Sequence, residues 1–239
     1  MDNLISPSTS SGNYPWQTTI SKQKSFNGIG LHSGNLISVT LKPAKENTGI
    51  IFIRTDIDKK IKERSIKALY SNVSDTSLCT TIENEYGIKV STIEHLMAAF
   101  NGTGIDNIII ELNGPEVPIM DGSSLPLIEI IENCGIESLK VKRKILKILK
   151  KIEVRVDNKY CSFVPSKEQK FSVEIDFENK AVGKQSASTS LANYNFKNFA
   201  SNARTFGFMK DVEYMRSQGL GLGGSIDNCI IVDNNEIIN

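Results

Sequence analysis

The stretch Ser91-Thr-Ile-Glu-His-Leu-Met-Ala-Ala-Phe-Asn-Gly102 stands shortly before a second one, Ile108-Ile-Ile-Glu-Leu112, and together they decide the fold class. In the first, apolar side chains recur at the i, i+3, i+4 and i+7 positions of one helical face, namely Ile93, Leu96, Met97 and Phe100. The second is short and rich in β-branched residues, which is typical of a strand. A helix and a strand in close succession predict a chain of the α+β class.

Further strands and helices are expected on both sides of this stretch. Strands are predicted at residues 37–41, 50–54 and 80–82, and a helix at 124–134 that ends at Gly135. Later in the chain, strands are predicted at 152–156, 160–164 and 171–177, helices at 195–203 and 210–218, and a strand at 229–233. Strands followed by helices, twice over, predict two α+β units.

The division between the two units is expected near residue 140. We predict a flexible tail at 1–17, an N-terminal α+β domain at 18–139 and a C-terminal α+β domain at 140–239. The second unit has a strand at 229–233 and the start of another at 236–238, but no closing helix like the one at 125–131. We therefore expect the second domain to be truncated and to expose part of its apolar sheet surface.

The composition is that of an ordinary globular protein. The chain has 239 residues, 39% of them hydrophobic, and a formal net charge of +1, which gives no general attraction to nucleic acid or acidic membranes. Its four cysteines form no C-x-x-C pair and are read as reduced thiols. No signal peptide or membrane-spanning run is present in the sequence, and a cytoplasmic location is expected.

Two interpretations of Glu94 and His95 remain open from spacing alone. Ser91 and Glu94 match a capping box, in which both side chains satisfy N–H groups at a helix start. In that case His95 would be an exposed surface residue without a functional role. Alternatively, a carboxylate beside an imidazole suits metal-assisted hydrolysis, because the imidazole can bind zinc while the carboxylate takes a proton from water. A catalytic zinc site needs three protein ligands, so His32 or further carboxylates would have to join His95.

Three other patterns also have two interpretations. The glycine-rich stretches at 28–34 and 219–224 could suggest nucleotide loops, but tight turns are favoured because neither has the strand-then-helix order that such loops need. Seven of the twelve residues at 140–151 are basic, which fits a solvated strand or linker face at least as well as phosphate contacts. The spacing of Phe208, Val212 and Met215 indicates either core packing or the lining of an apolar channel.

Six stretches, taken in order, resemble one family, the zinc-dependent UDP-3-O-acyl-N-acetylglucosamine deacetylases of lipid A synthesis. They lie at residues 28–34, 91–96, 104–107, 118–123, 203–209 and 222–225. The resemblance implies a two-domain α+β sandwich, in which each domain is a small sheet and the helices pack between the domains. It also implies an amide hydrolysis that removes an acetyl group from an acyl-UDP-sugar, with Zn²⁺ as cofactor.

The resemblance also implies roles for individual residues. His95 matches a zinc ligand, Glu94 the general base that activates the zinc-bound water, and Thr205 a hydroxyl that helps to stabilise the oxyanion. Positions near the substrate's sugar and acyl chain are matched by Leu78, Phe206 and Gly224, and the family's acyl passage is matched by Phe208, Val212 and Met215. His32 corresponds to a turn histidine of the family and not to a ligand.

The sequence departs from the family pattern at three residues that the resemblance places later in the chain. A helix carrying H-K-x-x-x-D, which supplies two zinc ligands, and a later histidine acid are not present in the 239 residues. We therefore expect a catalytically incomplete deacetylase chain, with a non-catalytic remnant or binding module that keeps the acyl-UDP-sugar pocket as the alternative. Nucleic acid is not an expected partner, no oligomer is predicted, and the acylated substrate would bring the chain near a membrane.

Overall fold

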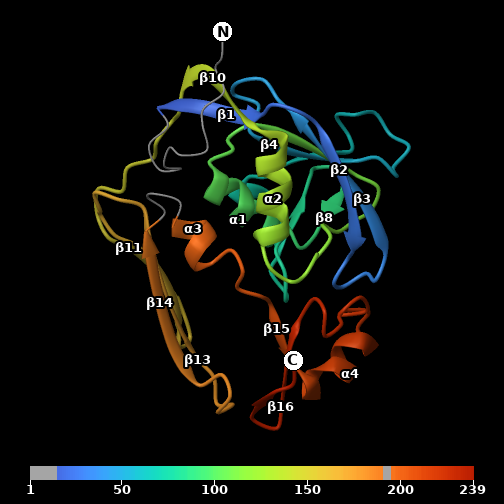
Figure 1. Cartoon of the computed structure of the whole chain (residues 1–239), viewed down its shortest axis with the longest axis vertical. Helices are drawn as coiled ribbons and strands as arrows, with labels where there is room; N and C mark the ends of the chain where they lie inside the picture. The colour runs from blue at the N-terminus through green and yellow to red at the C-terminus, as the bar shows by residue number, and fades with distance from the viewer. Residues whose placement is uncertain (1–14, 191–194) are drawn as a thin grey trace.

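The computed structural model describes residues 15–190 and 195–239 of the chain. The expected tail therefore lies outside the described residues, except for its last positions, where Trp16 and Gln17 begin strand β1 (Trp16–Ile20). Residues 191–194, which precede the predicted helix at 195–203, also lie outside the described residues. Figure 1 shows a larger body formed by the first half of the chain, from which the elements of the second half extend.

A five-stranded sheet forms the centre of the first half and confirms the α+β class. Its strand order is β2 (Lys24–Ile29), β3 (Leu36–Pro43), β9 (Ile108–Leu112), β4 (Ile50–Arg54) and β5 (Ser65–Lys67). β9 runs parallel to β4 and antiparallel to β3. The isoleucine-rich strand of the opening stretch is thus central, where β-branched side chains can pack on both faces.

Two helices cover this sheet and complete the core. They are α1 (Glu94–Thr103) and α2 (Leu125–Cys134), which pack against each other. Leu96 and Phe100 of α1, and Ile128 of α2, are buried in the same cluster as Phe52 and Ile110 of the sheet. α1 ends at Gly104 in the left-handed conformation, and α2 ends at Gly135, which has φ 70°, as predicted.

Smaller sheets complete the first half. β6 (Val73–Asp75) follows the short helix η1 (Tyr70–Asn72) and pairs with β7 (Thr81–Glu83), which pairs with β8 (Lys89–Val90). β1 pairs antiparallel with β10 (Ile136–Lys142), so that Trp16 lies opposite Lys142. The chain thus stays in contact with its first strand up to Lys142, and the remaining elements follow this residue.

The second half consists of separate small sheets. Two antiparallel hairpins come first, β11 (Ile152–Val156) with β12 (Lys159–Phe163) and β13 (Lys170–Asp176) with β14 (Lys184–Ser190). α3 (Asn195–Phe199) follows, and then β15 (Phe206–Phe208), α4 (Met209–Ser217), β16 (Ile230–Asp233) and β17 (Glu236–Ile237). β15 and β16 are parallel neighbours, and β16 pairs antiparallel with β17.

The surface of the second half carries many apolar side chains. Large hydrophobic residues of both hairpins are exposed, among them Val154, Val156, Phe163, Phe171 and Val173. Within residues 15–190 and 195–239, every helix is too short or too polar to cross a bilayer.

Candidate functional site

The start of α1 places Glu94 and His95, and its local structure differs from the predicted capping box. α1 begins at Glu94, one turn later than Ser91, because the chain first turns through Thr92 in the left-handed region (φ 56°). Glu94 Oε2 accepts a 2.9 Å hydrogen bond from the Thr80 N–H, and Ser91 Oγ accepts one of 3.0 Å from the Thr81 hydroxyl. The capping-box prediction was wrong, because both side chains bind the β7 segment and not the helix N–H groups.

His95 lies half-buried on the first turn of α1. Burial lowers its pKa below the ordinary value of 6.5, and the negative charges of Glu94 and Asp121 offset part of this effect. Neither ring nitrogen makes a hydrogen bond to another residue in the described part of the chain. A neutral imidazole with a free nitrogen is the form that binds a metal ion.

The loop at 118–123 connects the His95 region to the second half of the chain. Asp121 accepts hydrogen bonds from the N–H (2.9 Å) and the hydroxyl (2.8 Å) of Ser123, which fix its carboxylate, and its charge raises the pKa of His95. Its backbone oxygen accepts a 2.7 Å bond from Arg204 Nε. The sequence motif contained Asp121, but its charge effect on His95 could be found only from the structure.

Thr205 is held against the same loop by backbone hydrogen bonds on both sides. Its N–H donates to the Gly122 carbonyl at 2.8 Å, and its own carbonyl accepts from the Ile230 N–H at 2.9 Å. Its side chain is half-buried, and the hydroxyl makes no hydrogen bond to the residues that the structure describes. The structure thus brings Thr205 to the loop that carries Asp121, with a hydroxyl that is free to bind another molecule.

A buried carboxylate, Glu116, fixes the 28–34 turn next to this region. It is 2% exposed and accepts hydrogen bonds from the His32 N–H (2.9 Å), the Ser33 N–H (2.8 Å) and the Thr92 hydroxyl (2.9 Å). It therefore joins the turn to the residues just before α1. Nothing in the spacing of the sequence indicated this role.

The two glycine-rich stretches pack against each other, which supports tight turns over nucleotide loops. The Gly223 N–H donates to the Leu31 carbonyl at 3.0 Å, and the Leu222 N–H donates to the His32 carbonyl at 3.2 Å. A Cβ on Gly223 would lie 2.2 Å from the Gly30 carbonyl oxygen. These glycines are needed for close backbone contact, and their N–H groups are used within the protein.

His32 and Cys79 form a second titratable pair near Glu94. The Gly221 N–H lies 3.4 Å from His32 Nδ1 and donates to it, so the ring proton of the neutral form belongs on Nε2, which is buried. The Cys79 side chain raises the pKa of His32, and His32 in turn lowers the pKa of the Cys79 thiol. The charge of Glu94 also raises the pKa of His32, as it does that of His95.

The residues matched to the acyl chain and the sugar lie at the surface of the second half and on the β6–β7 connection. Leu78 is 63% exposed and has a φ of 63°, and Gly224 is half-buried near Leu31. Val212 and Met215 lie half-buried on α4, a helix in which no residue is fully buried. The core interpretation of this stripe is therefore not supported.

Phe208 lies in β15 and not on the helix with Val212 and Met215. Because side chains two apart share one face of a strand, Phe206 and Phe208 lie together, with ring centroids 5.8 Å apart. Phe177 completes the cluster at 5.5 Å from Phe206 and 5.7 Å from Phe208. Phe177 was not among the predicted residues, and no motif in the sequence marks it.

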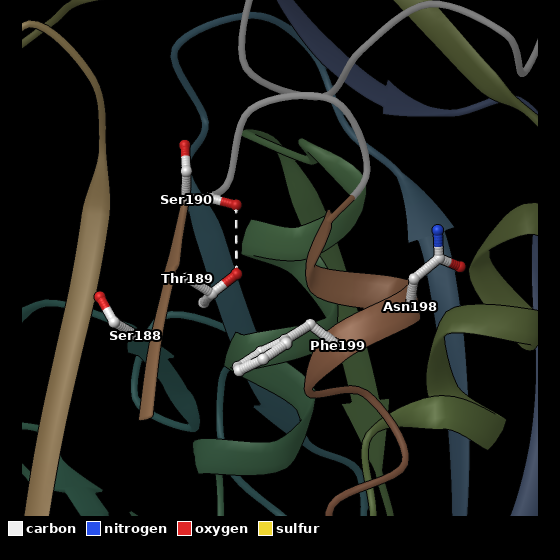
Figure 2. Close-up of a pocket in the computed structure, with 5 residues that line it drawn as sticks. All are labelled: Ser188, Thr189, Ser190, Asn198 and Phe199. Carbon is white, nitrogen blue, oxygen red and sulfur yellow. Dashed lines mark hydrogen bonds between the residues drawn. The ribbon is translucent and has the colours of Figure 1, made fainter. Parts of the chain in front are cut away.

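A pocket of about 430 Å³ lies elsewhere, between β14 and α3. Figure 2 shows its lining, which is mostly polar except for the ring of Phe199: Ser188, Thr189, Ser190, Asn198 and Phe199. None of the predicted site residues lines it. The candidate site therefore rests on the arrangement around His95, and not on this cavity.

The metal-ligand set around His95 is incomplete in the described part of the chain. No group of three or more His, Cys, Asp and Glu side chains able to hold a metal ion occurs in residues 15–190 and 195–239. The four cysteines are all free thiols, as predicted. His95 is thus one potential ligand, and the residues that surround it do not form a complete zinc centre.

Comparisons with known proteins agree with the sequence motifs. The family model of LpxC, UDP-3-O-acyl N-acetylglycosamine deacetylase, matches residues 17–239. The chain is 44% identical to the UDP-3-O-acyl-N-acetylglucosamine deacetylase of Pasteurella multocida over 226 residues, which cover 93% of this chain and 73% of that protein. It is 45% identical to the enzyme of the same name from Campylobacter fetus over 223 residues, with 93% and 74% covered. The chain therefore belongs to the LpxC family of deacetylases.

Proposed function

We propose that this chain acts on a UDP-3-O-acyl-N-acetylglucosamine and hydrolyses its acetamide. The relatives carry the name of this reaction, and the family match spans residues 17–239. The observation that carries the proposal is the link through the 118–123 loop, because the charge of Asp121 raises the pKa of His95 while the Gly122 carbonyl accepts a hydrogen bond from the Thr205 N–H. The start of α1 supplies the Glu94 carboxylate and the His95 imidazole, and the segment bound to Gly122 supplies the Thr205 hydroxyl.

Each of the three groups has a role that its environment supports. Glu94 is held by the Thr80 N–H through one oxygen, which leaves the other free to accept a proton from water. Thr205 offers an unused hydroxyl to the oxyanion that forms when water adds to the amide carbonyl. His95, kept neutral by burial, offers one nitrogen to a metal ion.

We propose Zn²⁺ as the cofactor, with His95 as one ligand. The residues around His95 do not fit a complete zinc site, since the described residues contain no group of three suitable ligands. We therefore propose that the 239-residue chain by itself binds zinc weakly and turns over slowly.

The remaining assignments follow from the same family match. The acyl chain would lie along Phe206, Phe208, Val212 and Met215, with Phe177 extending this apolar surface, and the sugar would lie near Leu78 and Gly224. The acylated substrate is the proposed partner, without nucleic acid, and the proposed compartment is the cytoplasm. These placements concern side chains that are exposed or half-buried and therefore accessible to a ligand.

A second candidate function is a binding module that holds the acyl-UDP-sugar without hydrolysing it. The incomplete ligand set favours this alternative, because a chain without a firmly held metal could keep the substrate surface and lose the chemistry. Binding of the substrate in the presence of a chelator, with no acetate released when zinc is restored, would support the binding module.

Acetate release from a substrate with a radiolabelled acetyl group tests the catalytic proposal. We expect slow release by the chain with added zinc, and loss of that release in Glu94→Gln. The matched control is Glu83→Gln, because Glu83 forms an ion pair with Lys89 at 3.3 Å and lies outside the proposed site. Release that is equal in the wild type and in Glu94→Gln would refute the assignment of Glu94.

A further inference from the structure

One segment between the two halves has properties that the proposed reaction does not use. Residues 144–150, with the sequence Lys-Ile-Leu-Lys-Ile-Leu-Lys, connect β10 to β11 without helix or strand. We call them the basic–apolar segment. Figure 1 shows the connection between β10 and β11 running along the outside of the molecule.

The apolar side chains of this segment are unusually exposed. Ile145, Leu146 and Leu149 are 83%, 85% and 80% exposed, more than any other large aliphatic side chain in the described residues. Grouped exposed aliphatic residues commonly mark a surface that contacts another molecule or a membrane.

The positive charges of the segment are also unused. Arg143, just before it, is bound to Asp106 at 2.8 Å, and Lys151, just after it, is bound to Glu153 at 2.8 Å. In contrast, Lys144, Lys147 and Lys150 have no ion pair or side-chain hydrogen bond with any residue that the structure describes. No acidic residue occurs between residues 138 and 152.

The unpaired lysines distinguish the basic–apolar segment from the two hairpins, whose apolar side chains are also exposed. On the β11–β12 hairpin, Arg155 and Lys151 are both paired with Glu153, and on the β13–β14 hairpin Lys184 is paired with Glu174. Several basic residues of the hairpins are thus paired with a neighbouring carboxylate. Among the residues that the structure describes, the basic–apolar segment joins three unpaired lysines to the most exposed large aliphatic side chains.

We propose that residues 144–150 dock the protein on an anionic phospholipid surface. The free lysines would contact lipid phosphates, and Ile145, Leu146 and Leu149 would enter the boundary between headgroups and acyl chains. Charge complementarity selects an anionic bilayer, and the aliphatic side chains give a reason to prefer a bilayer to a nucleic acid, which offers them no apolar phase. This contact belongs to the chain itself and is independent of the deacetylation, so vesicle binding and turnover can fail separately.

Vesicle co-sedimentation of the 239-residue chain tests the proposal. We expect binding to vesicles of phosphatidylcholine with phosphatidylglycerol, no binding to pure phosphatidylcholine, and weakening by 0.5 M salt because salt screens the lysines. The variant Lys144→Gln/Lys147→Gln/Lys150→Gln should bind roughly 100-fold more weakly, which is about fivefold for each lysine. The variant Ile145→Ser/Leu146→Ser/Leu149→Ser keeps the charge and should lose at least about tenfold.

The chain offers a control with the same change of charge. Lys59, Lys60 and Lys62 lie on an exposed loop that also contains Asp58 and Glu63, and their replacement by Gln should leave vesicle binding unchanged. An equal loss in this control would show general charge attraction and overturn the proposal. Binding to a 20-nucleotide DNA in place of vesicles, or self-association that the serine variant abolishes without any vesicle binding, would also overturn it.

Discussion

The N–H of Thr205 donates a 2.8 Å hydrogen bond to the carbonyl oxygen of Gly122, although the two residues lie in different halves of the chain. Gly122 follows Asp121, whose charge acts on His95, so this contact connects β15 to the start of α1. The site is thus assembled by backbone contacts between the halves as well as by its own side chains.

Gly122→Ala should destabilise the protein and disturb this connection. Gly122 has a φ of 88°, and a Cβ there would lie 2.2 Å from the Asn228 carbonyl oxygen. We expect a loss of about 3 kcal/mol in the free energy of unfolding, from backbone strain and steric overlap together, measured by urea denaturation. The control Gly49→Ala has φ 71° with no atom within 4 Å of the new Cβ, and should cost only about 1 kcal/mol. Equal costs for the two variants would contradict the predicted overlap.

Removal of the Glu116 carboxylate should be more costly than removal of a surface carboxylate. Glu116→Ala leaves the N–H groups of His32 and Ser33 and the hydroxyl of Thr92 without their acceptor, and we expect a loss of about 3 kcal/mol or more in the free energy of unfolding. Glu111→Ala removes a partly exposed ion pair with Lys42 and should cost less than about 1 kcal/mol. Urea denaturation of both variants measures the difference, and a Glu116→Ala cost no larger than that of Glu111→Ala would refute the predicted role.

The two histidines should titrate on opposite sides of the ordinary value of 6.5. Burial lowers the pKa of His95, whereas the neighbouring Cys79 raises that of His32. Since the chain has only two histidines, NMR titration of the imidazole Cε1–H signals gives two curves, which His32→Gln assigns. A His95 pKa at or above 6.5 would be inconsistent with its burial in the metal-free chain.

The same shifts predict opposite effects on stability. The pKa of His95 is lower in the folded state, so its contribution to stability should decline as the pH falls through its unfolded value of about 6.5. The pKa of His32 is higher in the folded state, so its contribution is complete below about 6.5 and is lost as the pH rises through the folded pKa. The free energy of unfolding of His32→Gln, measured by urea denaturation between pH 5 and 8, should still fall towards low pH. It should no longer show the fall towards high pH that is due to His32.

Cys79 should react with iodoacetamide at a lower pH than an isolated thiol. Its thiol is half-buried, but His32 lowers its pKa, and thiolate is the reactive form. Mass spectrometry should show slower alkylation of Cys79 at pH 7 in His32→Gln, while the exposed Cys161 serves as the internal reference. An unchanged ratio of Cys79 to Cys161 labelling would show that His32 does not activate the thiol.

Local patterns were sufficient to predict much of the fold. β4, β9 and β11 have the predicted bounds, because each is a β-branched run closed by turn-forming residues. α2 ends at the predicted Gly135, and the motifs identified the family through the order of six short stretches. Short strands without this composition, such as β1 and β2, were not predicted.

Contacts between distant residues could not be derived from the sequence pattern. The predicted capping box satisfied every local rule, but the β7 segment offers Glu94 a better-placed donor in the Thr80 N–H. Glu116 and Phe177 likewise act through partners many residues away, and neither lies in a recognisable spacing. Phe208 was grouped with a helix because its spacing fits both a helical stripe and the end of a strand.

Zinc titration of the metal-free chain by equilibrium dialysis tests most directly whether His95 was correctly assigned as the metal-binding residue. We expect the free energy of zinc binding by the wild type to be smaller than the roughly 10 kcal/mol or more of a complete structural zinc site. The substitution His95→Gln should weaken zinc binding by at least about tenfold. His32→Gln should change it less than about twofold, because His32 is engaged by Gly221 and Cys79. Zinc binding by His95→Gln that equals the wild type would contradict the account.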